Sequence, residues 1–397
     1  MIMSDINRIA LVTSGRADYG LLKPLWQKLQ ADALFAPTMI ATGSHLVAEQ
    51  GETISVLKAD GIEPLLEVDM ALQGDQPSQL AEASGQALAR FGRLFEQHDF
   101  DLVVILGDRF EMLAVAMAAM LNRLPIAHLH GGEATFGLID DAVRHSLTKM
   151  SALHFVSHDD YARRVIQMGE QPSRVFNVGA IGLDNIVELP LLSSTALQDE
   201  TGVDWTISTV LMTYHPVTLN DASAAAQEME VVLDAVIASG LQTVITMPNI
   251  DAGGEAMYQV IVAAQQAHPE QLHLVKSLGQ LRYLSAMQHC AMVLGNSSSG
   301  IIEAASFQKP VVNIGERQLG RVTGANVLHV DCQTEAILQA IETALSDAFV
   351  CLLAGVKNPY GNGHTAEKIV GHLKTLSLQD RSALLKKGFH DCAEACS

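Results

Sequence analysis

The richest group of reactive side chains lies between residues 128 and 145. His130 and Glu133 enclose a Gly-Gly pair, and Asp140 and Asp141 follow a few residues later. Carboxylates and imidazoles this close together can supply a general acid and a general base with different pKa values. The two glycines allow the backbone to approach a ligand closely. The segment therefore predicts proton-transfer chemistry.

Two other interpretations of this segment remain open. His128 and His130 share one face of a predicted strand, as two zinc ligands would, yet no cysteine or third histidine near by completes a tetrahedral set. A metal site is therefore not expected. Alternatively, His128 is a core residue and Asp140 or Asp141 only caps the helix that follows.

Two turns in the first half of the chain follow predicted strands. In Thr13–Gly20 (TSGRADYG), the backbone N–H groups of a helix start and the guanidinium of Arg16 suit a phosphate. In Gly107–Glu111 (GDRFE), Asp108 and Arg109 lie where a strand gives way to a helix. For both turns, an aspartate that merely caps the helix is the alternative.

Polar groups also follow predicted strands in the second half. Gly295–Glu303 (GNSSSGIIE) combines glycines, serine hydroxyls and a helix start, which suit a pyrophosphate, and Glu303 lies one turn on, where it can hold ribose hydroxyls. His215 ends another strand, and Arg317 and Arg321 follow a third. Simple capping explains each turn alone, but not the whole set.

Short apolar or β-branched runs, which alternate with helical patterns, must position these turns. Runs such as LVVIL do not alternate, as expected for strands covered on both faces. Helices are predicted at Leu21–Leu29, Gln79–Phe95, Glu111–Leu121, Asp141–Met150 and Asp159–Met168. Strands are predicted at Ile9–Thr13, Pro37–Ala41, Leu102–Leu106, Pro125–Leu129, Leu153–Val156, Arg174–Val178, Thr209–Thr213, Thr243–Thr246, Leu272–Val275, Ala291–Leu294, Pro310–Ile314 and Val327–Val330.

The alternation predicts an α/β fold of two Rossmann-like, doubly wound domains. The pattern pauses at Leu189–Thr206, which reads as a connector with no clear strand. We expect a first domain over 1–188 with the catalytic carboxylates, a second over 207–362 that binds the nucleotide, and a helical tail over 363–397. In one possible arrangement, this tail packs on the first domain. The active site is expected in the cleft between the domains, at the C-terminal ends of both sheets.

Composition restricts the partners. The chain has 25 Lys and Arg against 44 Asp and Glu, a net charge of −19, and only 5% aromatic residues, which disfavours nucleic acid and anionic membranes. Its first residues predict a strand rather than a signal peptide. The five cysteines lack paired spacing, so we expect a reduced, cytoplasmic protein. Dinucleotide, P-loop and serine-hydrolase motifs are absent from the sequence.

The ordered motifs GRADYG, ILGDRFE, HGGE with IDDxxRH, YHPVT, MPNIDAGG and GNSSSGIIEA with GERQLGR resemble the hydrolysing UDP-N-acetylglucosamine 2-epimerases of sialic-acid-like sugar synthesis. The resemblance implies a glycosyltransferase-B-like fold, a UDP-sugar substrate, no cofactor, no metal, and a homodimer or homotetramer. It also implies that UDP leaves C1 as C2 loses a proton, which gives a glycal. Water then adds at C1 while C2 is reprotonated on the other face.

The resemblance also assigns roles to individual residues. Asp108 and Asp140 match catalytic carboxylates, and His130 and Glu133 are predicted to join them. Asp184 matches a position that faces the sugar, and Asn249 one near the nucleotide. The remaining substrate-binding residues are predicted to be Arg16, Arg109, His215, Ser297, Ser298, Gly300, Glu303 and Arg321.

His130 departs from the sialic-acid branch of this family, which commonly has glutamate immediately before the Gly-Gly pair. An imidazole can replace a carboxylate in acid–base chemistry, because its ordinary pKa lies near neutrality. The histidine is similar to the branch that acts on UDP-N,N′-diacetylbacillosamine, on the route to legionaminic acid. Both UDP-sugars therefore remain candidate substrates. A glycosyltransferase of the same fold and a non-catalytic sugar-nucleotide sensor remain alternative functions.

Overall fold

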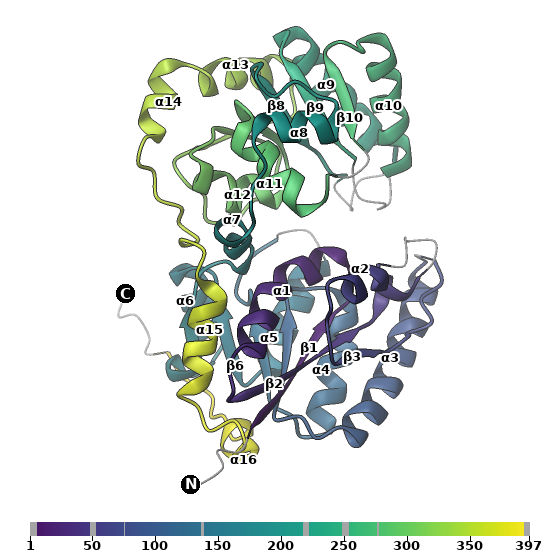
Figure 1. Ribbon diagram of the computed structural model, residues 1–397, viewed down its shortest axis with the longest axis vertical. Coiled ribbons are helices and arrows are strands. Elements are labelled where there is room, and N and C mark those ends of the chain that lie inside the picture. The colour runs from purple at the N-terminus through teal and green to yellow at the C-terminus, as the bar shows by residue number, and fades with distance from the viewer. Residues whose placement is uncertain are drawn as a thin grey trace. The chain divides into compact units, whose positions relative to one another are not determined.

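The chain folds into two units, each with its own sheet and core (Figure 1). The first unit comprises Met1–Glu133, Ile139–Asn185 and Gly363–Ser397, and the second comprises Ala134–Leu138 and Ile186–Asn362. The residues described by this computed structural model are 6–47, 53–74, 76–135, 139–216, 222–247, 254–275 and 278–392.

The first unit contains a parallel sheet of seven strands in the order β3-β2-β1-β4-β5-β6-β7. Its strands are β1 (Asn7–Thr13), β2 (Phe35–Ala41), β3 (Leu65–Glu67), β4 (Leu102–Leu106), β5 (Ile126–Leu129), β6 (Leu153–Val156) and β7 (Val175–Asn177). The strand order reverses beside β1, which is where open α/β sheets place their ligands. Every strand predicted for this half is present, whereas the short β3 was not predicted.

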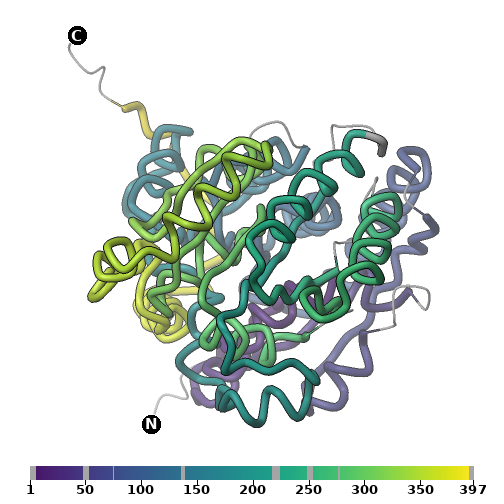
Figure 2. The backbone as a smooth tube through the Cα atoms, turned by 90° about the horizontal axis from the view of Figure 1, so that it is seen from above, coloured from purple at the N-terminus to yellow at the C-terminus, as the bar shows by residue number. Residues whose placement is uncertain are grey.

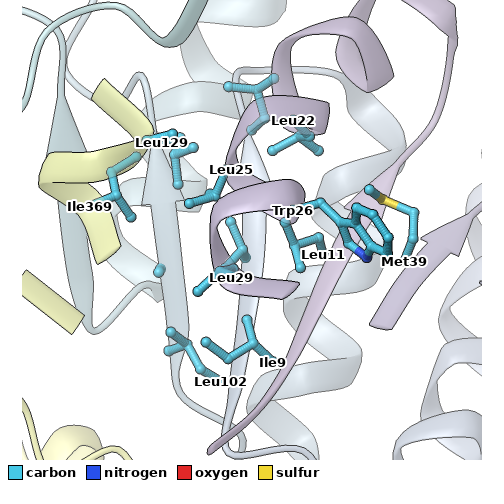
Figure 3. Close-up of a cluster of buried hydrophobic side chains, with 14 of the residues drawn as sticks. Ile9, Leu11, Leu22, Leu25, Trp26, Leu29, Met39, Leu102, Leu129 and Ile369 are labelled. Atoms are coloured by element: carbon cyan, nitrogen blue, oxygen red, sulfur yellow. The ribbon is translucent and has the colours of Figure 1, made fainter. Parts of the chain in front are cut away.

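The central strand β1 shows why its sequence lacks alternation. Ile9 and Leu11 pack under α1 (Arg16–Gln30) and α15 (Thr365–Lys374), as Figure 3 shows. Ala10, between them, faces the opposite cluster, which is formed with α3 (Pro77–Gln97) and α4 (Phe110–Leu121). Both faces of the sheet are therefore apolar and covered.

The first unit contains further helical elements. They are α2 (Ile54–Ala59), α5 (Ile139–Met150), α6 (Asp159–Gln167) and α16 (Arg381–Leu385), together with the single turns η1 (Gly43–Leu46), η3 (Pro172–Arg174) and η4 (Ile181–Leu183). The helix predicted at Leu21–Leu29 begins earlier, at Arg16, so that the GRADYG turn is itself the helix start.

The second unit contains a parallel sheet of six strands in the order β10-β9-β8-β11-β12-β13. The strands are β8 (Thr209–Thr213), β9 (Gln242–Thr246), β10 (Leu272–Val275), β11 (Met292–Gly295), β12 (Val311–Ile314) and β13 (Val327–Val330). Its helical elements are α8 (Ser194–Thr201), α9 (Ala222–Ser239), α10 (Gly254–Ala267), α11 (Gly279–His289), α12 (Ser298–Ile302), η5 (Ala304–Phe307), α13 (Thr334–Ala344) and α14 (Asp347–Leu353), while α7 (Asp184–Glu188) lies where the chain passes from one unit to the other.

This second sheet is also covered on both faces. Val210 and Met212 of β8 pack into a cluster with α9, α10 and α13, and Leu211 packs with α8 and α11 on the other side. Helices α9 and α10 lie side by side (Figure 2). The predicted α/β class with two parallel sheets is therefore confirmed.

The segment predicted as a connector contains helix α8. The Ser193 hydroxyl caps it by accepting a hydrogen bond from the Ala196 N–H at 3.2 Å. The serine- and threonine-rich start was therefore a helix cap rather than a loop.

No single described helix is long and apolar enough to cross a membrane, and α13 and α14 reach that length and composition only as a pair bent by 63°. The four cysteines in the described part of the chain carry free thiols: Cys290, Cys332, Cys351 and Cys392.

Candidate functional site

A buried arginine organises the acidic groups of the first unit. Arg144 on α5 is 1% exposed, and its guanidinium pairs with the carboxylate of Asp108. It also donates to the Glu133 carbonyl at 3.1 Å and lies 3.5 Å from Asp141 Oδ1. Because a guanidinium keeps its charge even when buried, Arg144 fixes a positive charge beside Asp108. Arg144 is part of the motif IDDxxRH, but the sequence alone does not show that Arg144 is buried or that it pairs with Asp108.

Asp140 lies in the electrostatic field of Asp108. Burial raises the pKa of Asp140, the neighbouring Asp108 carboxylate raises it further, and Arg144 and Arg109 act in the opposite direction. The structure thus brings the two predicted catalytic carboxyl groups together in unequal surroundings. Such a pair can divide the tasks of acid and base.

His130 is held by contacts to both ring nitrogens. Its backbone has a φ of 62°, and Nδ1 lies 2.7 Å from Glu133 Oε1. The Ile181 N–H donates to Nε2 at 3.3 Å, so the hydrogen of the neutral ring lies on Nδ1 and points to Glu133. Glu133 Oε1 also accepts a hydrogen bond from the Ser157 hydroxyl at 2.9 Å. An acid–base role for His130 would require the contact with Ile181 to break, and it stays a prediction.

His128 is the core residue that the alternative interpretation described. It is fully buried, its Nε2 lies 2.7 Å from the Gly107 carbonyl oxygen, and its Nδ1 lies 3.1 Å from the Thr148 hydroxyl. Burial lowers the pKa of His128 to about 3. Among the described residues, no group of three His, Cys, Asp or Glu side chains could hold a metal ion.

Arg109 is paired with carboxylates inside the first unit. Its Nη2 donates to Glu111 Oε1 at 2.7 Å, and its Nε lies 3.9 Å from Asp18 Oδ2. Burial raises the pKa of Asp18, and Arg109 opposes that change. The Arg109 side chain is still 44% exposed, and Arg16 is exposed at the first residue of α1. Phosphate binding by these two arginines stays a prediction.

The carboxylate of Asp184 is engaged inside the first unit. It is 1% exposed, and its two carboxylate oxygens accept hydrogen bonds from the Thr365 and Ala366 N–H groups, each at 2.7 Å. These are orphan donors at the start of α15. Asp184 therefore caps this helix, and its predicted position facing the sugar stays a prediction.

A chain of hydroxyl groups underlies the serine-rich turn of the second unit. Ser297 caps α12, and its Oγ lies 3.0 Å from the Ser299 Oγ, which lies 2.6 Å from the Tyr283 hydroxyl. Gly295 has a φ of 130°, and a Cβ there would lie 2.0 Å from the Thr213 carbonyl oxygen. Only glycine fits at this position of the turn. The predicted residues Ser297 and Ser298 are partly exposed.

Asn296 links this turn to His215. Its side chain accepts from the His215 N–H at 2.7 Å and donates to the His215 carbonyl at 2.8 Å. Its own carbonyl accepts from Arg317 Nη1 at 3.0 Å. Burial, together with the charge of Arg317, lowers the pKa of His215 to about 4. Arg317 is therefore part of this cluster. The predicted Arg321 lies further along the chain, with its N–H bonded to the Gln318 carbonyl.

Glu303 and Gly300 complete the predicted groups around α12. Burial raises the pKa of Glu303 to about 7. Gly300 is buried, and a Cβ there would lie 3.1 Å from Val311 Cγ1, so the glycine allows α12 to lie close to β12. Asn249 lies outside the described residues.

The sequence matches the family of UDP-N-acetylglucosamine 2-epimerase over residues 27–374. The chain belongs to this family. The resemblance carried by the motifs is therefore confirmed. Among curated relatives, this epimerase-family chain is 37% identical to the UDP-N,N′-diacetylbacillosamine 2-epimerase (hydrolyzing) of Legionella pneumophila. The alignment spans 378 residues and covers 95% of this chain and 98% of that protein. It is 35% identical to the GDP/UDP-N,N′-diacetylbacillosamine 2-epimerase (hydrolyzing) of Campylobacter jejuni, over 86% of this chain and 88% of that protein.

Solved structures of this family share the fold. The Neisseria meningitidis UDP-GlcNAc 2-epimerase, bound to UDP-GlcNAc, aligns with a TM-score of 0.77 over 93% of this chain and 100% of that chain, at 18% identity. The Methanocaldococcus jannaschii UDP-GlcNAc 2-epimerase, in complex with UDP-GlcNAc and UDP, aligns with a TM-score of 0.75 over 93% and 100%, at 15% identity. The predicted glycosyltransferase-B-like fold is thereby confirmed.

Proposed function

We propose that this protein is a hydrolysing 2-epimerase that converts a UDP-2-acetamido sugar into UDP and the free manno-configured sugar. The observation that carries the proposal is the pair of carboxyl groups Asp108 and Asp140. The charge of Asp108 raises the pKa of Asp140, while Asp108 itself is paired with the buried Arg144. The hydrolysing epimerases of Legionella pneumophila and Campylobacter jejuni support it independently.

The proposed reaction has two steps. First, the C1–O bond to UDP breaks while one carboxylate takes the proton from C2, which leaves a C1–C2 double bond. The second carboxyl group then protonates C2 on the opposite face while water adds its hydroxyl to C1. That carboxylate takes the remaining proton of the water, and the first carboxyl group releases the C2 proton to solvent. We assign the two proton transfers to Asp108 and Asp140, because only one of them needs to be ionised at a time.

The departure of UDP must carry much of the first step, because no carbonyl group acidifies the C2 hydrogen. We propose that the diphosphate is held by groups of the second unit, namely His215, Ser297, Ser298 and Arg321. We add Arg317, because it donates to the Asn296 carbonyl beside these residues. Phosphate binding by Arg16 and Arg109 of the first unit stays a prediction. Donors placed at the leaving group stabilise the charge that develops there.

We propose UDP-N,N′-diacetylbacillosamine as the preferred substrate and UDP-N-acetylglucosamine as the second candidate. The support is His130 before the Gly-Gly pair and the names of the two relatives described above. We also propose a cytoplasmic enzyme that works as a homodimer or homotetramer without a cofactor.

The test is a side-by-side assay of both UDP-sugars without any acceptor, in which UDP is quantified and the sugar is identified by NMR. In D2O, the product should carry deuterium at C2. If neither substrate releases UDP, the proposal is wrong. Release that depends on an added acceptor would instead indicate a glycosyltransferase, and binding without turnover would indicate a sensor.

Replacing His130 by glutamate should shift substrate preference toward UDP-N-acetylglucosamine. The change removes the imidazole contacts to Glu133 and Ile181 and adds a negative charge beside Glu133. We expect the ratio of kcat/KM values for the two UDP-sugars to change about tenfold, the size of one altered charged hydrogen bond. His268→Glu, at an exposed histidine, is the control. An unchanged ratio would contradict the role of His130 in specificity.

Glu303 should make nucleoside binding depend on pH. A carboxyl group with a pKa of about 7 is mostly protonated at pH 6 and mostly ionised at pH 8, and the ionised form accepts ribose hydroxyls more strongly. The affinity for uridine, which carries no titrating phosphate, should therefore rise about tenfold between those pH values, as calorimetry can measure. Glu303→Gln should abolish the dependence. A slope that persists in this variant would exclude Glu303 as its source.

A further inference from the structure

His128 is a fully buried histidine on β5 that contacts two segments with predicted catalytic groups. Its Nε2 lies 2.7 Å from the carbonyl oxygen of Gly107, the residue directly before Asp108. Its Nδ1 lies 3.1 Å from the hydroxyl oxygen of Thr148 on α5, the helix that also carries Asp140. One imidazole ring therefore joins the turn after β4 to helix α5.

The two hydrogen bonds of His128 have a fixed direction. Burial lowers the pKa of the ring to about 3, so the ring is neutral and carries one N–H. A carbonyl oxygen can only accept a hydrogen bond, so this hydrogen lies on Nε2 and points to Gly107. Nδ1 then accepts a hydrogen bond from the Thr148 hydroxyl. Because the ring is buried and both nitrogens are engaged, His128 is not itself a proton-transfer group.

The turn before Asp108 depends on β5 for both peptide groups of Gly107. The Gly107 N–H donates to the Leu129 carbonyl at 3.0 Å, and the Gly107 carbonyl accepts from His128. Gly107 has a φ of 74°, in the region that favours glycine, so the chain changes direction at this point. Loss of the His128 ring would remove one of the two bonds that hold this turn.

The first glycine of the Gly-Gly pair lies against the same ring. A Cβ at Gly131 would lie 3.0 Å from His128 Nδ1 and 3.0 Å from the Thr148 hydroxyl oxygen. A side chain there would crowd both atoms, so Gly131 makes room for their hydrogen bond. Because Glu133 follows this pair, three segments with predicted catalytic residues meet at His128.

We propose that His128 is a positioning residue, which holds Asp108 beside Asp140. This inference rests on the proposed function, because it concerns the two carboxyl groups to which proton transfer is assigned. Arg144, one turn before Thr148 on α5, pairs with Asp108 as well. The ion pair and the histidine therefore fix the turn to α5 at two points. Misplacing a reacting group by about 1 Å can cost about 10²-fold in rate, so this support affects turnover although it touches no substrate.

His128→Phe tests the proposal, because phenylalanine keeps a flat ring and removes both hydrogen bonds. We expect kcat for UDP release to fall about 10²-fold. Affinity for UDP in calorimetry should not change, because the diphosphate is assigned to the second unit. His128→Gln should recover at least about tenfold of the lost kcat, because an amide supplies one donor and one acceptor. A folded His128→Phe variant with wild-type kcat, or a His128→Gln variant no faster than His128→Phe, would overturn the proposal.

His154→Phe is the matched control. His154 is also fully buried, and it lies on the neighbouring strand β6 in register with His128. Its Nε2 lies 3.0 Å from Glu170 Oε2, so this variant removes a buried contact of the same sheet without touching the Asp108 turn. It should lower the melting temperature but leave kcat of the folded enzyme unchanged. An equal loss of kcat in both variants would refute a specific role for His128.

A measurement without substrate separates this inference from the proposed function. Burial raises the pKa of Asp140, and the neighbouring Asp108 carboxylate raises it further. If His128→Phe lets Asp108 move away, the pKa of Asp140 should fall toward its ordinary value. Carbon NMR of labelled aspartate carboxyl groups measures this pKa, and Asp140→Asn assigns the signal. An unchanged pKa in the folded variant would overturn the proposal even if the enzyme acts on neither UDP-sugar.

Discussion

Asp108→Asn should lower kcat for UDP release about 10²–10⁴-fold, the range that a positioned proton-transfer group contributes. The Asp108 carboxylate is paired with the buried Arg144, and an amide keeps the shape of the side chain but cannot take a proton from C2. Affinity for UDP should stay within about threefold, because the diphosphate is assigned to other residues. Stopped assays for UDP and calorimetry with UDP measure the two quantities separately.

The control for this variant must separate lost chemistry from lost folding. Asp99→Asn removes another aspartate that is paired with arginines in the same unit, Arg8 and Arg381, but at the surface. It should leave kcat unchanged. Asp140→Asn should show the same loss of turnover as Asp108→Asn. Near-normal turnover in either variant of the carboxylate pair would refute its assignment.

Lys387→Met should lower the free energy of unfolding by about 1–3 kcal/mol, as expected when a buried carboxylate loses one of several charged hydrogen-bond donors. The Lys387 ammonium lies 3.0 and 2.9 Å from the two carboxylate oxygens of Glu170 and also donates to the Lys149 and Ser151 carbonyls. Glu170 is 1% exposed, so the variant leaves a buried carboxylate with fewer donors. Urea denaturation measures the loss.

Lys386→Met is the matched control, because Lys386 is the neighbouring lysine and is exposed. This variant should change the free energy of unfolding by less than about 0.5 kcal/mol.

Burial alone would raise the pKa of Glu170, but hydrogen bonds from His154, Lys149 and Lys387 hold it down to about 2. The stability from these contacts is therefore present above the ordinary pKa of 4.5 and is lost as the pH falls through about 2. The difference between wild type and Lys387→Met should shrink over that interval. A constant difference would contradict the ionic origin.

The sheets were predictable because their strands are continuous apolar runs. LVVIL, for example, is β4 without change of boundary, since both of its faces are buried. β3 has three residues, L-L-E, too few for any pattern, and its place at the sheet edge depends on pairing with β2.

The positions of Asp108 and Asp140 beside strand ends were also predictable, whereas their surroundings were not. Arg144 looks like an ordinary helix-surface arginine in sequence, and only the packing of α5 buries it against Asp108. Asp184 meets its partner Thr365 from a distant part of the chain. Arg317 and Arg321 occupy one turn, and only the turn's geometry shows which one reaches Asn296.

The capping of α15 by Asp184 has a consequence for biosynthesis. Because Gly363–Ser397 belong to the first unit, that unit is incomplete on the ribosome until the last of its three segments has been translated. The second unit is made almost entirely from Ile186–Asn362, which emerge earlier. Domains generally fold from the N-terminus onward during synthesis. In this chain the order of completion is reversed: the unit that starts first is finished last.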